Sequence, residues 1–311
     1  MGTPEFAIPA LRAIAACCEV AMVVTRPDRR RGRGRVMSAS PIAEEAGRLG
    51  LPVQKPDQVN APEPRAALAA LKADLFAVVA FGAILSPALL QVPRLGSFNL
   101  HGSLLPDYRG ASPVQRALWD GRAGTGVTTM WIDEGLDTGD LALQRWVTIE
   151  ASDDAGTLTA KLADLGGPLL AQTLTLAHAG KAPRLPQDRA AGSYARKLEK
   201  RDGVVDFALD AETVWHHQRA VTPWPGATTA FRDRHVLLVR TSPAHRLALG
   251  VAPGTMTRVG GGGIEVACAP GALRLLTVRP EGRGDLAADE WARGARIQAG
   301  DRLTVEKEAH A

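Results

Sequence analysis

Cysteine is scarce in this sequence, with three residues among 311. Cys17 and Cys18 are adjacent and Cys268 is distant, so the chain has neither a spaced disulfide framework nor the ligand spacing of a zinc site. No apolar run is long enough to span a bilayer, and the first residues lack the basic stretch and apolar core of a signal peptide. We therefore expect a reduced, soluble, cytoplasmic protein that uses no metal and contacts no membrane.

The signatures of common phosphate-binding folds are also missing. The sequence has no Gly-x-Gly-x-x-Gly fingerprint and no Walker loop, which argues against a nicotinamide dehydrogenase or an NTPase. The run of glycines at 260–263 lacks the strand-to-helix context of a phosphate loop, so we predict a hairpin turn there. Internal repeats and coiled-coil heptads are likewise absent.

The bulk properties fit a globular protein of one large or two ordinary domains. Hydrophobic residues make up 45% and charged residues 23% of the 311 positions. The formal net charge is +4, which on its own is weak support for an anionic partner.

Helix-forming stretches alternate with apolar, β-branched runs in the first 180 residues. Thr3, Ser40, Ser86 and Ser112 each precede a proline, and this pattern predicts an N-cap followed by Pro at the first helical position. A long helix is expected over residues 154–179, with Gly-Gly-Pro at 166–168 as a possible break. Strands are expected at 18–25, 74–81, 96–101, 126–132 and 141–149. The alternation predicts an α/β fold, a Rossmann-like parallel sheet with helices on both faces.

The second part of the chain has a different character. Asp210 and the residues to Val221 form one helical pattern, and short apolar runs separated by Gly and Pro follow from Thr228 onward. That pattern predicts a smaller, C-terminal antiparallel β-barrel of OB-like type. We expect a catalytic domain over 1–180, a linker over 181–199 and the barrel over 200–311.

The most informative motif is the predicted strand that carries Asn99 and His101. Side chains two apart on a strand share a face, so an amide donor and an imidazole point the same way at the strand's end. Ligands bind at the carboxyl ends of strands in such sheets. Asp137, on a glycine-flanked turn, could orient or deprotonate His101. The plainer alternative is that Asn99 and His101 only satisfy backbone groups at the strand end. Asn, His and Asp without an evident Ser or Cys nucleophile suggest acyl-type transfer to an attacking atom of the substrate.

Several longer motifs resemble the folate-dependent formyltransferases, and among them the enzymes that formylate methionyl-tRNA. They are the opening GTPEFA, RPDRRRGRGR at 26–35, SFNLHGSLLPDYRGASP at 97–113, GLDTGD at 135–140, YARKL at 194–198 and RAVTPWPG at 219–226. The resemblance covers nearly the whole chain. It implies that Asn99, His101 and Asp137 are catalytic. It also implies a one-carbon transferase that moves formyl from 10-formyltetrahydrofolate to the α-amine of initiator methionyl-tRNA in translation initiation.

The same resemblance implies ligand contacts elsewhere. The segment that matches the family's folate-contacting loop gives Ser103, Leu104, Leu105 and Pro106 as folate contacts. The resemblance also places the pterin against the turn after the strand expected at 74–81, which adds Phe81, Gly82, Ile84 and Leu85. Asp140 either binds ligand or caps a turn. The tRNA contacts implied are Arg29, Arg31, Arg33, Arg35 and Lys197. The plain reading of the arginine-rich stretch is a solvated loop, although arginine also grips phosphates and stacks on unpaired bases. The C-terminal barrel would contact the tRNA body, and we expect a monomer.

Two other functions fit the motifs less well. A formyltransferase acting on a small amine, such as an amino-sugar nucleotide or glycinamide ribotide, would not need the arginine-rich loop or the C-terminal barrel. A non-catalytic RNA-binding protein would not need Asn99, His101 and Asp137 together. In the proposed reaction Asn99 and His101 form the oxyanion site, and whether His101 or Asp137 takes the proton first is open.

One departure from the family concerns the first residues. The family places a β-strand ahead of its Gly-Thr-Pro turn, and here the turn begins at Gly2. We expect that about six residues of an interior strand lie upstream of Met1. Their loss would leave neighbouring strand edges unpaired.

Overall fold

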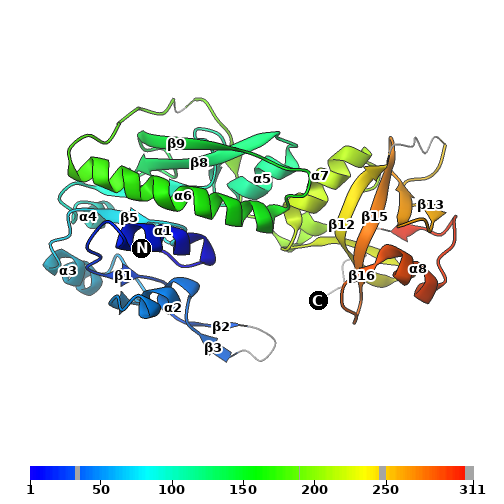
Figure 1. The fold of residues 1–311 in the computed structure, drawn as a ribbon, viewed down its shortest axis with the longest axis horizontal. Coiled ribbons are helices and arrows are strands. Elements are labelled where there is room, and N and C mark those ends of the chain that lie inside the picture. The colour runs from blue at the N-terminus through cyan, green and yellow to red at the C-terminus, as the bar shows by residue number, and fades with distance from the viewer. Residues whose placement is uncertain (32–35, 189, 245–249, 305–311) are drawn as a thin grey trace. The chain divides into compact units, whose positions relative to one another are not determined.

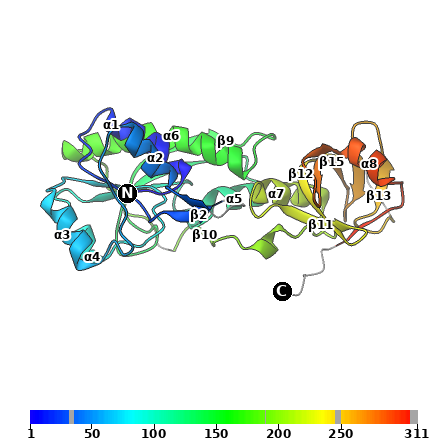
Figure 2. The same cartoon turned by 90° about the horizontal axis from the view of Figure 1, so that it is seen from below.

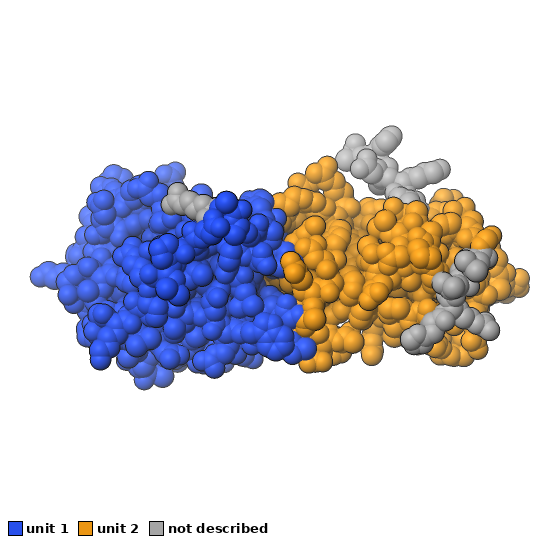
Figure 3. All heavy atoms as spheres, turned by 90° about the horizontal axis from the view of Figure 1, so that it is seen from above, with its two compact units in different colours: residues 1–113, 124–148, 159–195 blue, residues 114–123, 149–158, 196–311 orange. Residues whose placement is uncertain are grey.

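The computed structural model describes residues 1–31, 36–188, 190–244 and 250–304. It divides into two compact units, which Figure 3 distinguishes by colour. Unit 1 comprises residues 1–113, 124–148 and 159–195, and unit 2 comprises 114–123, 149–158 and 196–311. Two short stretches of the N-terminal sequence thus belong to the C-terminal unit. No helix among the described residues is long and apolar enough to cross a membrane.

Unit 1 is built on a mixed sheet with the order β5-β6-β8-β9. Its strands are β5 (Phe76–Val78), β6 (Ser97–His101), β8 (Gly124–Trp131) and β9 (Leu141–Thr148). β5 and β6 are parallel, as expected, whereas β8 pairs antiparallel with both β6 and β9. The short connection between β8 and β9 accounts for their antiparallel pairing, since parallel neighbours need a longer crossover. A separate parallel pair joins β1 (Val23–Val24) to β4 (Val53–Gln54).

Helices flank this sheet, with α1 and α6 on one side and α3 and α4 on the other (Figures 1 and 2). The chain begins with a 3-10 turn at Glu5–Ala7, and the helices up to residue 178 are α1 (Ile8–Ala15), α2 (Pro41–Arg48), α3 (Pro62–Ala70), α4 (Pro87–Leu90), α5 (Pro113–Trp119) and α6 (Ala155–His178). The sequence therefore predicted the α/β class correctly for this unit.

Helix α6 continues through Pro168, so the expected break is wrong. A Cβ atom on Gly166 would lie 2.7 Å from Leu100 of β6, and one on Gly167 would lie 2.7 Å from the backbone of Pro9. The two glycines let α6 lie close to the sheet and to α1. We attribute the uninterrupted helix to this tertiary packing, which outweighs the hydrogen bond lost at Pro168.

The predicted caps are confirmed at two of the Ser-Pro sites. The hydroxyl of Ser40 accepts the N–H of Ala43 at 3.2 Å, and that of Ser86 accepts the N–H of Leu89 at 3.3 Å. The predicted cap at Thr3 is wrong: its hydroxyl donates to the carbonyl of Phe81 at 3.0 Å and so joins the N-terminal segment to the chain that follows β5.

The arginine-rich stretch is not a simple loop. β2 (Arg29–Arg31) and β3 (Val36–Ser38) form an antiparallel hairpin that carries it. Residues 32–35, between the two strands in the sequence, lie outside the described residues.

Unit 2 contains the predicted helix and an antiparallel sheet. Asp210 caps α7 (Ala211–Val221) by accepting the N–H of Thr213 at 2.9 Å. The sheet has the order β13-β14-β15-β12-β11-β17, with β16 paired to β15, and its residues form a continuous apolar core with α7 and α8. The bounds are β11 (Ala227–Phe231), β12 (Arg234–Ala244), β13 (Met256–Val259), β14 (Ile264–Ala267), β15 (Ala272–Pro280), β16 (Leu286–Ala287), α8 (Ala288–Ala295) and β17 (Leu303–Thr304), with a 3-10 turn at Lys200–Gly203. The glycines at 260–263 make the β13–β14 hairpin turn, as predicted.

Candidate active site

Asn99 and His101 lie on β6, whose register fixes their direction. Asn99 pairs with Met130 of β8, and His101 pairs with Thr128. Leu100, between them, packs on Gly166 of α6. Because side chains alternate along a strand, Asn99 and His101 share the face away from α6. Asn99 is partly exposed, whereas His101 keeps only 5% of its surface accessible.

His101 meets an oxygen atom at each ring nitrogen. Nε2 lies 2.9 Å from the carbonyl oxygen of Tyr108, and Nδ1 lies 3.6 Å from Oδ2 of Asp137. A carbonyl oxygen only accepts, so we assign the hydrogen of the neutral ring to Nε2. Nδ1 then carries the lone pair, and it faces the carboxylate at a distance longer than a hydrogen bond.

Asp137 is held by a strained turn rather than by regular structure. Its backbone is left-handed, with φ of 55°, and the backbone N–H of Gly110 donates to its Oδ2 at 2.9 Å. The Gln187 side chain donates to the carbonyls of Asp137 at 3.0 Å and Gly139 at 2.7 Å. A Cβ on Gly139 would lie 1.9 Å from the carbonyl of Trp131, so only glycine fits there. The turn therefore fixes one carboxylate oxygen beside His101.

The loop after β6 is pinned to β8 and β9. Thr128 donates to the carbonyl of Ser103 at 2.7 Å and accepts the N–H of Leu105 at 3.1 Å. Gln144 donates to the carbonyl of Leu105 at 2.8 Å. The Ser103 hydroxyl donates within the loop, to the carbonyl of Asp107, at 2.6 Å. These bonds set the path of the loop and hence the position of the Tyr108 carbonyl that meets His101.

The residues expected to contact folate fall into two groups. Phe81, Leu85, Ser103 and Leu105 are buried, at 3%, 6%, 0% and 3% exposure, and Phe81 and Leu85 belong to an apolar core cluster. The other group is accessible to different degrees: Gly82, Ile84, Leu104 and Pro106, with Ile84 at 77% exposure. Asp140 pairs with Arg184 at 2.7 Å.

The residues expected to contact tRNA are described only in part. Arg29 is exposed and, with Arg26, lines a cavity of about 230 Å³ together with the hydroxyl residues Thr3, Ser38 and Ser40. Arg31 is the last residue of β2. Arg33 and Arg35 lie outside the described residues. Lys197 is exposed in unit 2.

Sequence reasoning missed the groups that hold the site together. Tyr108 and Gly110 both have positive φ, 60° and 109°, and they supply a carbonyl to His101 and an N–H to Asp137. Gln187 comes from the segment expected to be a linker and holds the Asp137 turn. The Tyr-Arg-Gly string after Asp107 could have indicated a turn, but not which backbone groups it presents.

The arrangement suits proton transfer next to a polarised carbonyl. A donor amide, an imidazole with a carboxylate beside it, and fixed backbone dipoles are the parts that acyl transfer uses. No cluster of His, Cys, Asp or Glu with the makings of a metal site occurs within the described part of the chain.

Comparison with known sequences identifies both halves of the chain. Residues 6–174 match the formyl transferase family model, and residues 197–296 match that of the formyl transferase C-terminal domain. A methionyl-tRNA formyltransferase of Symbiobacterium thermophilum is 43% identical over 98% of this chain and 94% of its own length. Another from Geobacter metallireducens is 41% identical over 97% of each chain.

Solved structures share the fold at lower sequence identity. An N-formyltransferase of Helicobacter canadensis, in complex with folinic acid and dTDP-3-aminofucose, has a TM-score of 0.65 at 17% identity and covers 88% of this chain and 96% of its own. A sugar 3N-formyltransferase, WlaRD, has a TM-score of 0.65 at 16% identity over 91% of this chain and 97% of its own. The matches of both family models, and relatives above 40% identity over nearly the full length, show that the chain belongs to the formyl transferase family.

Proposed function

We propose that the protein transfers the formyl group of 10-formyltetrahydrofolate to the α-amine of methionine esterified to initiator tRNA. The observation that carries the proposal is the His101–Asp137 pair at the end of β6, on the strand face that also bears Asn99. The named relatives, which match along nearly the whole chain, support the choice of acceptor. The reaction supports translation initiation and needs no metal.

Asn99 is the group best placed to stabilise the oxyanion. Attack of the amine on the formyl carbon builds negative charge on the formyl oxygen, and a neutral amide N–H can donate to it. His101 is less free to donate, because its Nε2 hydrogen is engaged by the carbonyl of Tyr108. We therefore assign the main oxyanion contact to Asn99.

The same geometry favours His101 over Asp137 as the proton acceptor. Nδ1 of His101 carries a lone pair, while Oδ2 of Asp137 already accepts the N–H of Gly110. When Nδ1 takes the proton from the attacking amine, the carboxylate 3.6 Å away stabilises the imidazolium. The proton then passes to the leaving folate nitrogen. In this scheme Asp137 positions His101 electrostatically.

The ligand contacts follow from exposure and charge. Gly82, Ile84, Leu104 and Pro106 are the accessible members of the folate set, so we assign them direct contact. The buried members, Phe81, Leu85, Ser103 and Leu105, shape the pocket from behind, and Asp140 fixes its rim by pairing with Arg184. Arg29, with Arg31, Arg33 and Arg35 of the same arginine-rich stretch of sequence, binds acceptor-stem phosphates. Lys197 and the C-terminal domain contact the tRNA body. The protein acts as a monomer in the cytoplasm.

The test is a competition between acceptors for one labelled donor. The purified protein receives 10-formyltetrahydrofolate labelled in the formyl group, together with methionyl-tRNA, an amino-sugar nucleotide and glycinamide ribotide. We expect the label in the tRNA fraction, in a product that releases labelled N-formylmethionine when its ester bond is hydrolysed by alkali. Label on a small amine would show that the small amine, and not methionyl-tRNA, is the acceptor. If the protein binds the folate but transfers no label, it is a binding protein and not a transferase.

A further inference from the structure

Tyr194 is an exposed aromatic residue beside the candidate active site. Its strand, β10 (Tyr194–Ala195), pairs in parallel with β7 (Arg109–Gly110). The pairing lays the ring against Gly110, where a Cβ atom would lie 2.7 Å from a ring carbon. Tyr194 nevertheless keeps 63% of its surface accessible, whereas Tyr108, the other tyrosine of the chain, is buried. The fold thus holds one aromatic ring at the surface and not in a core.

Gly110 connects this ring to the carboxylate of the site. The N–H of Gly110 donates to Oδ2 of Asp137 at 2.9 Å. Taken end to end, the two contacts and the bonds of Gly110 place the edge of the Tyr194 ring no more than about 9 Å from that oxygen. A side chain on Gly110 would push the ring away from this backbone. The ring is therefore close enough to bind a group that is covalently linked to the reacting amine.

Backbone hydrogen bonds hold Tyr194 from both sides. The N–H of Arg109 donates to the carbonyl of Ser193 at 2.9 Å, and the N–H of Ala111 donates to the carbonyl of Ala195 at 2.8 Å. The residues before and after the ring are therefore both anchored to the segment that contains β7. An aromatic side chain on a fixed backbone has few rotatable bonds to restrict, so it loses little freedom when a ligand binds to it.

Two other exposed aromatic side chains are placed differently. Trp146 lies over Gly124, the first residue of β8, where a Cβ atom would be 2.5 Å from its ring. Trp224 belongs to unit 2. Tyr194 differs from both because it lies against a residue that donates to Asp137.

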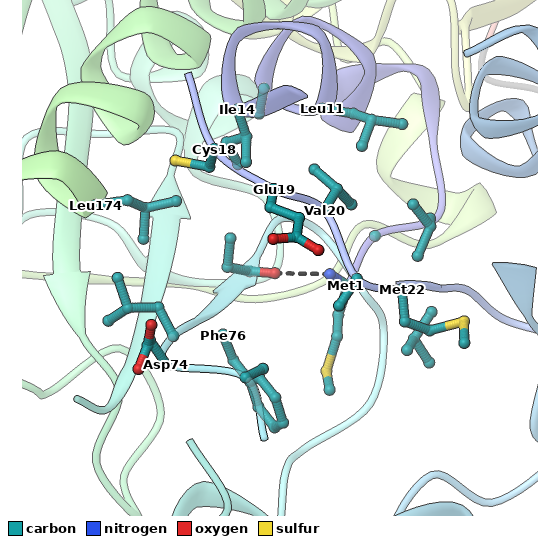
Figure 4. Close-up of a pocket in the computed structure, with 18 of the residues that line it drawn as sticks. Met1, Leu11, Ile14, Cys18, Glu19, Val20, Met22, Asp74, Phe76 and Leu174 are labelled. Atoms are coloured by element: carbon teal, nitrogen blue, oxygen red, sulfur yellow. Dashed lines mark hydrogen bonds between the residues drawn. The ribbon is translucent and has the colours of Figure 1, made fainter. Parts of the chain in front are cut away.

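A cavity of about 550 Å³ elsewhere in unit 1 offers no alternative place for the end of the acceptor (Figure 4). Met1 and Phe76 line it, and the amino group of Met1 donates to the carbonyl of Ala77 at 2.6 Å. Neither His101 nor Asp137 lines it. The terminal nucleotide of an aminoacyl-tRNA carries the amino acid on its own ribose, so its base stays near the reacting amine and outside this cavity.

Two cationic residues follow Tyr194 in the chain. Arg196 and Lys197 are both exposed, and Arg196 pairs with Asp202. An aromatic ring followed by positive charge is the combination that proteins use to bind single-stranded nucleic acid, since bases stack on the ring and cations attract the phosphates. The accessible residues assigned to folate lie on the stretches that follow β5 and β6. The surroundings of Tyr194 therefore suit a nucleotide better than a pterin.

We infer that Tyr194 stacks on the terminal nucleobase of the acceptor tRNA and so positions its aminoacyl end; this inference rests on the proposed function. The base and the amine belong to one aminoacylated nucleotide, so a base held on Tyr194 brings the amine toward His101 and Asp137. Stacking on an aromatic side chain tolerates any base and is strong enough to change affinity about tenfold. Tyr194 is a positioning residue, since no reacting atom is assigned to it.

Binding of uncharged tRNA tests the contact without catalysis. Wild type and Tyr194→Ala are each titrated with initiator tRNA and with the same tRNA shortened by its 3′-terminal nucleotide. We expect Tyr194→Ala to weaken binding of the intact tRNA about tenfold and to leave binding of the shortened tRNA unchanged, because the shortened tRNA lacks the base that stacks. An equal loss on both tRNAs, or no loss on either, would overturn the inference.

Two further variants separate stacking from packing on Gly110. Tyr194→Phe keeps the aromatic face, and we expect it to bind intact tRNA as tightly as wild type does. Tyr194→Leu still covers Gly110 with an apolar side chain but has no aromatic face, so we expect the same loss as in Tyr194→Ala. Wild-type affinity in Tyr194→Leu would show that the ring packs on the loop without stacking on a base, and the inference would be wrong.

Steady-state formyl transfer separates this inference from the proposed function. We expect Tyr194→Ala to raise KM for methionyl-tRNA about tenfold, with KM for the formyl donor unchanged and Tyr194→Phe at the wild-type value. A raised KM for the formyl donor would place the folate on the ring in place of the base, and a fall in kcat shared by both variants also contradicts the inference. If the wild-type protein neither binds nor formylates methionyl-tRNA, the proposed function fails, and this inference fails with it.

Discussion

His101 is held at both ring nitrogens, by the Tyr108 carbonyl at 2.9 Å and by the Asp137 carboxylate at 3.6 Å. Neither partner is related to His101 by helix or strand periodicity, so the sequence pattern does not predict either contact. These two contacts give the ring nitrogens different roles. Nε2 donates to a fixed carbonyl oxygen, whereas Nδ1 can accept and release a proton. The roles follow because a carbonyl oxygen can only accept a hydrogen bond, which places the hydrogen of the neutral ring on Nε2.

Replacing His101 by Gln tests that division. Gln offers an N–H that can still reach the carbonyl of Tyr108, but it cannot take a proton. We expect kcat to fall about 100- to 10,000-fold, the range typical of a lost general base, with KM for tRNA unchanged. Steady-state kinetics and circular dichroism give the answer, and a folded variant with near wild-type kcat would remove His101 from proton transfer.

The free amine of Met1 makes stability depend on pH in a defined direction. Its pKa is about 5 when folded and 8.0 as a free amine. The unfolded chain therefore binds more protons between these values, so the free energy of unfolding rises with pH from about 5 to 8. We expect this rise in urea unfolding of the 311-residue chain, and its loss when the amine is acetylated. The same slope in both samples would contradict the burial of the amine.

At the scale of elements, glycines decide how closely α6 approaches its neighbours. Gly167 of α6 packs against the backbone of Pro9, whereas Gly47 of α2 has open space where a Cβ would lie. Both are helical glycines in unit 1, so they differ mainly in what surrounds them.

Alanine at these two positions is expected to change stability with opposite signs. Gly47→Ala gains about 0.5–1 kcal/mol from helix propensity. Gly167→Ala loses about 1–3 kcal/mol, because the added methyl meets backbone that cannot move aside. Urea unfolding of unit 1 measures both. Stabilisation by Gly167→Ala would mean that α6 does not lie against α1 as described.

Features that depend only on neighbouring residues were predicted correctly, and predictions failed where a residue distant in sequence intervenes. Ser40, Ser86 and Asp210 cap helices because a cap needs only neighbours three residues away. Thr3 fails as a cap because Phe81, remote in sequence, takes its hydroxyl. Asn99 and His101 could be placed on one face from strand periodicity alone. The Tyr108 carbonyl and the Gly110 N–H could not be anticipated, because they depend on how the loop after β6 folds back.

For the whole molecule, the formyl transferase family and its C-terminal domain match successive parts of the chain, and the structure resolves into two compact units. A protein of two compact units need not unfold in one step, so urea unfolding has to be followed with probes that report on each unit separately. The net charge is +4, and the arginine-rich hairpin concentrates positive charge in unit 1. Electrostatic attraction to a polyanion is a property of the molecule as a whole and is weakened by salt.

Arg29→Ala tests that attraction. Arg29 is exposed and lines the cavity of about 230 Å³ beside Arg26. We expect a higher KM for methionyl-tRNA at low salt, an effect that shrinks as salt rises, and an unchanged KM for the formyl donor. Lys72→Ala, which removes a charge far along the chain from the hairpin, serves as the control. An effect of Arg29→Ala that is independent of salt would point to a role other than phosphate contact.

The central claim, that Asn99 holds the oxyanion while His101 takes the proton, is tested most directly by one single-turnover measurement. Enzyme in excess, saturated with formyl donor and labelled methionyl-tRNA, is quenched over time for wild type and Asn99→Ala. The account predicts a rate lower by about 100- to 1,000-fold with tRNA binding unchanged. A rate within about twofold of wild type would contradict it.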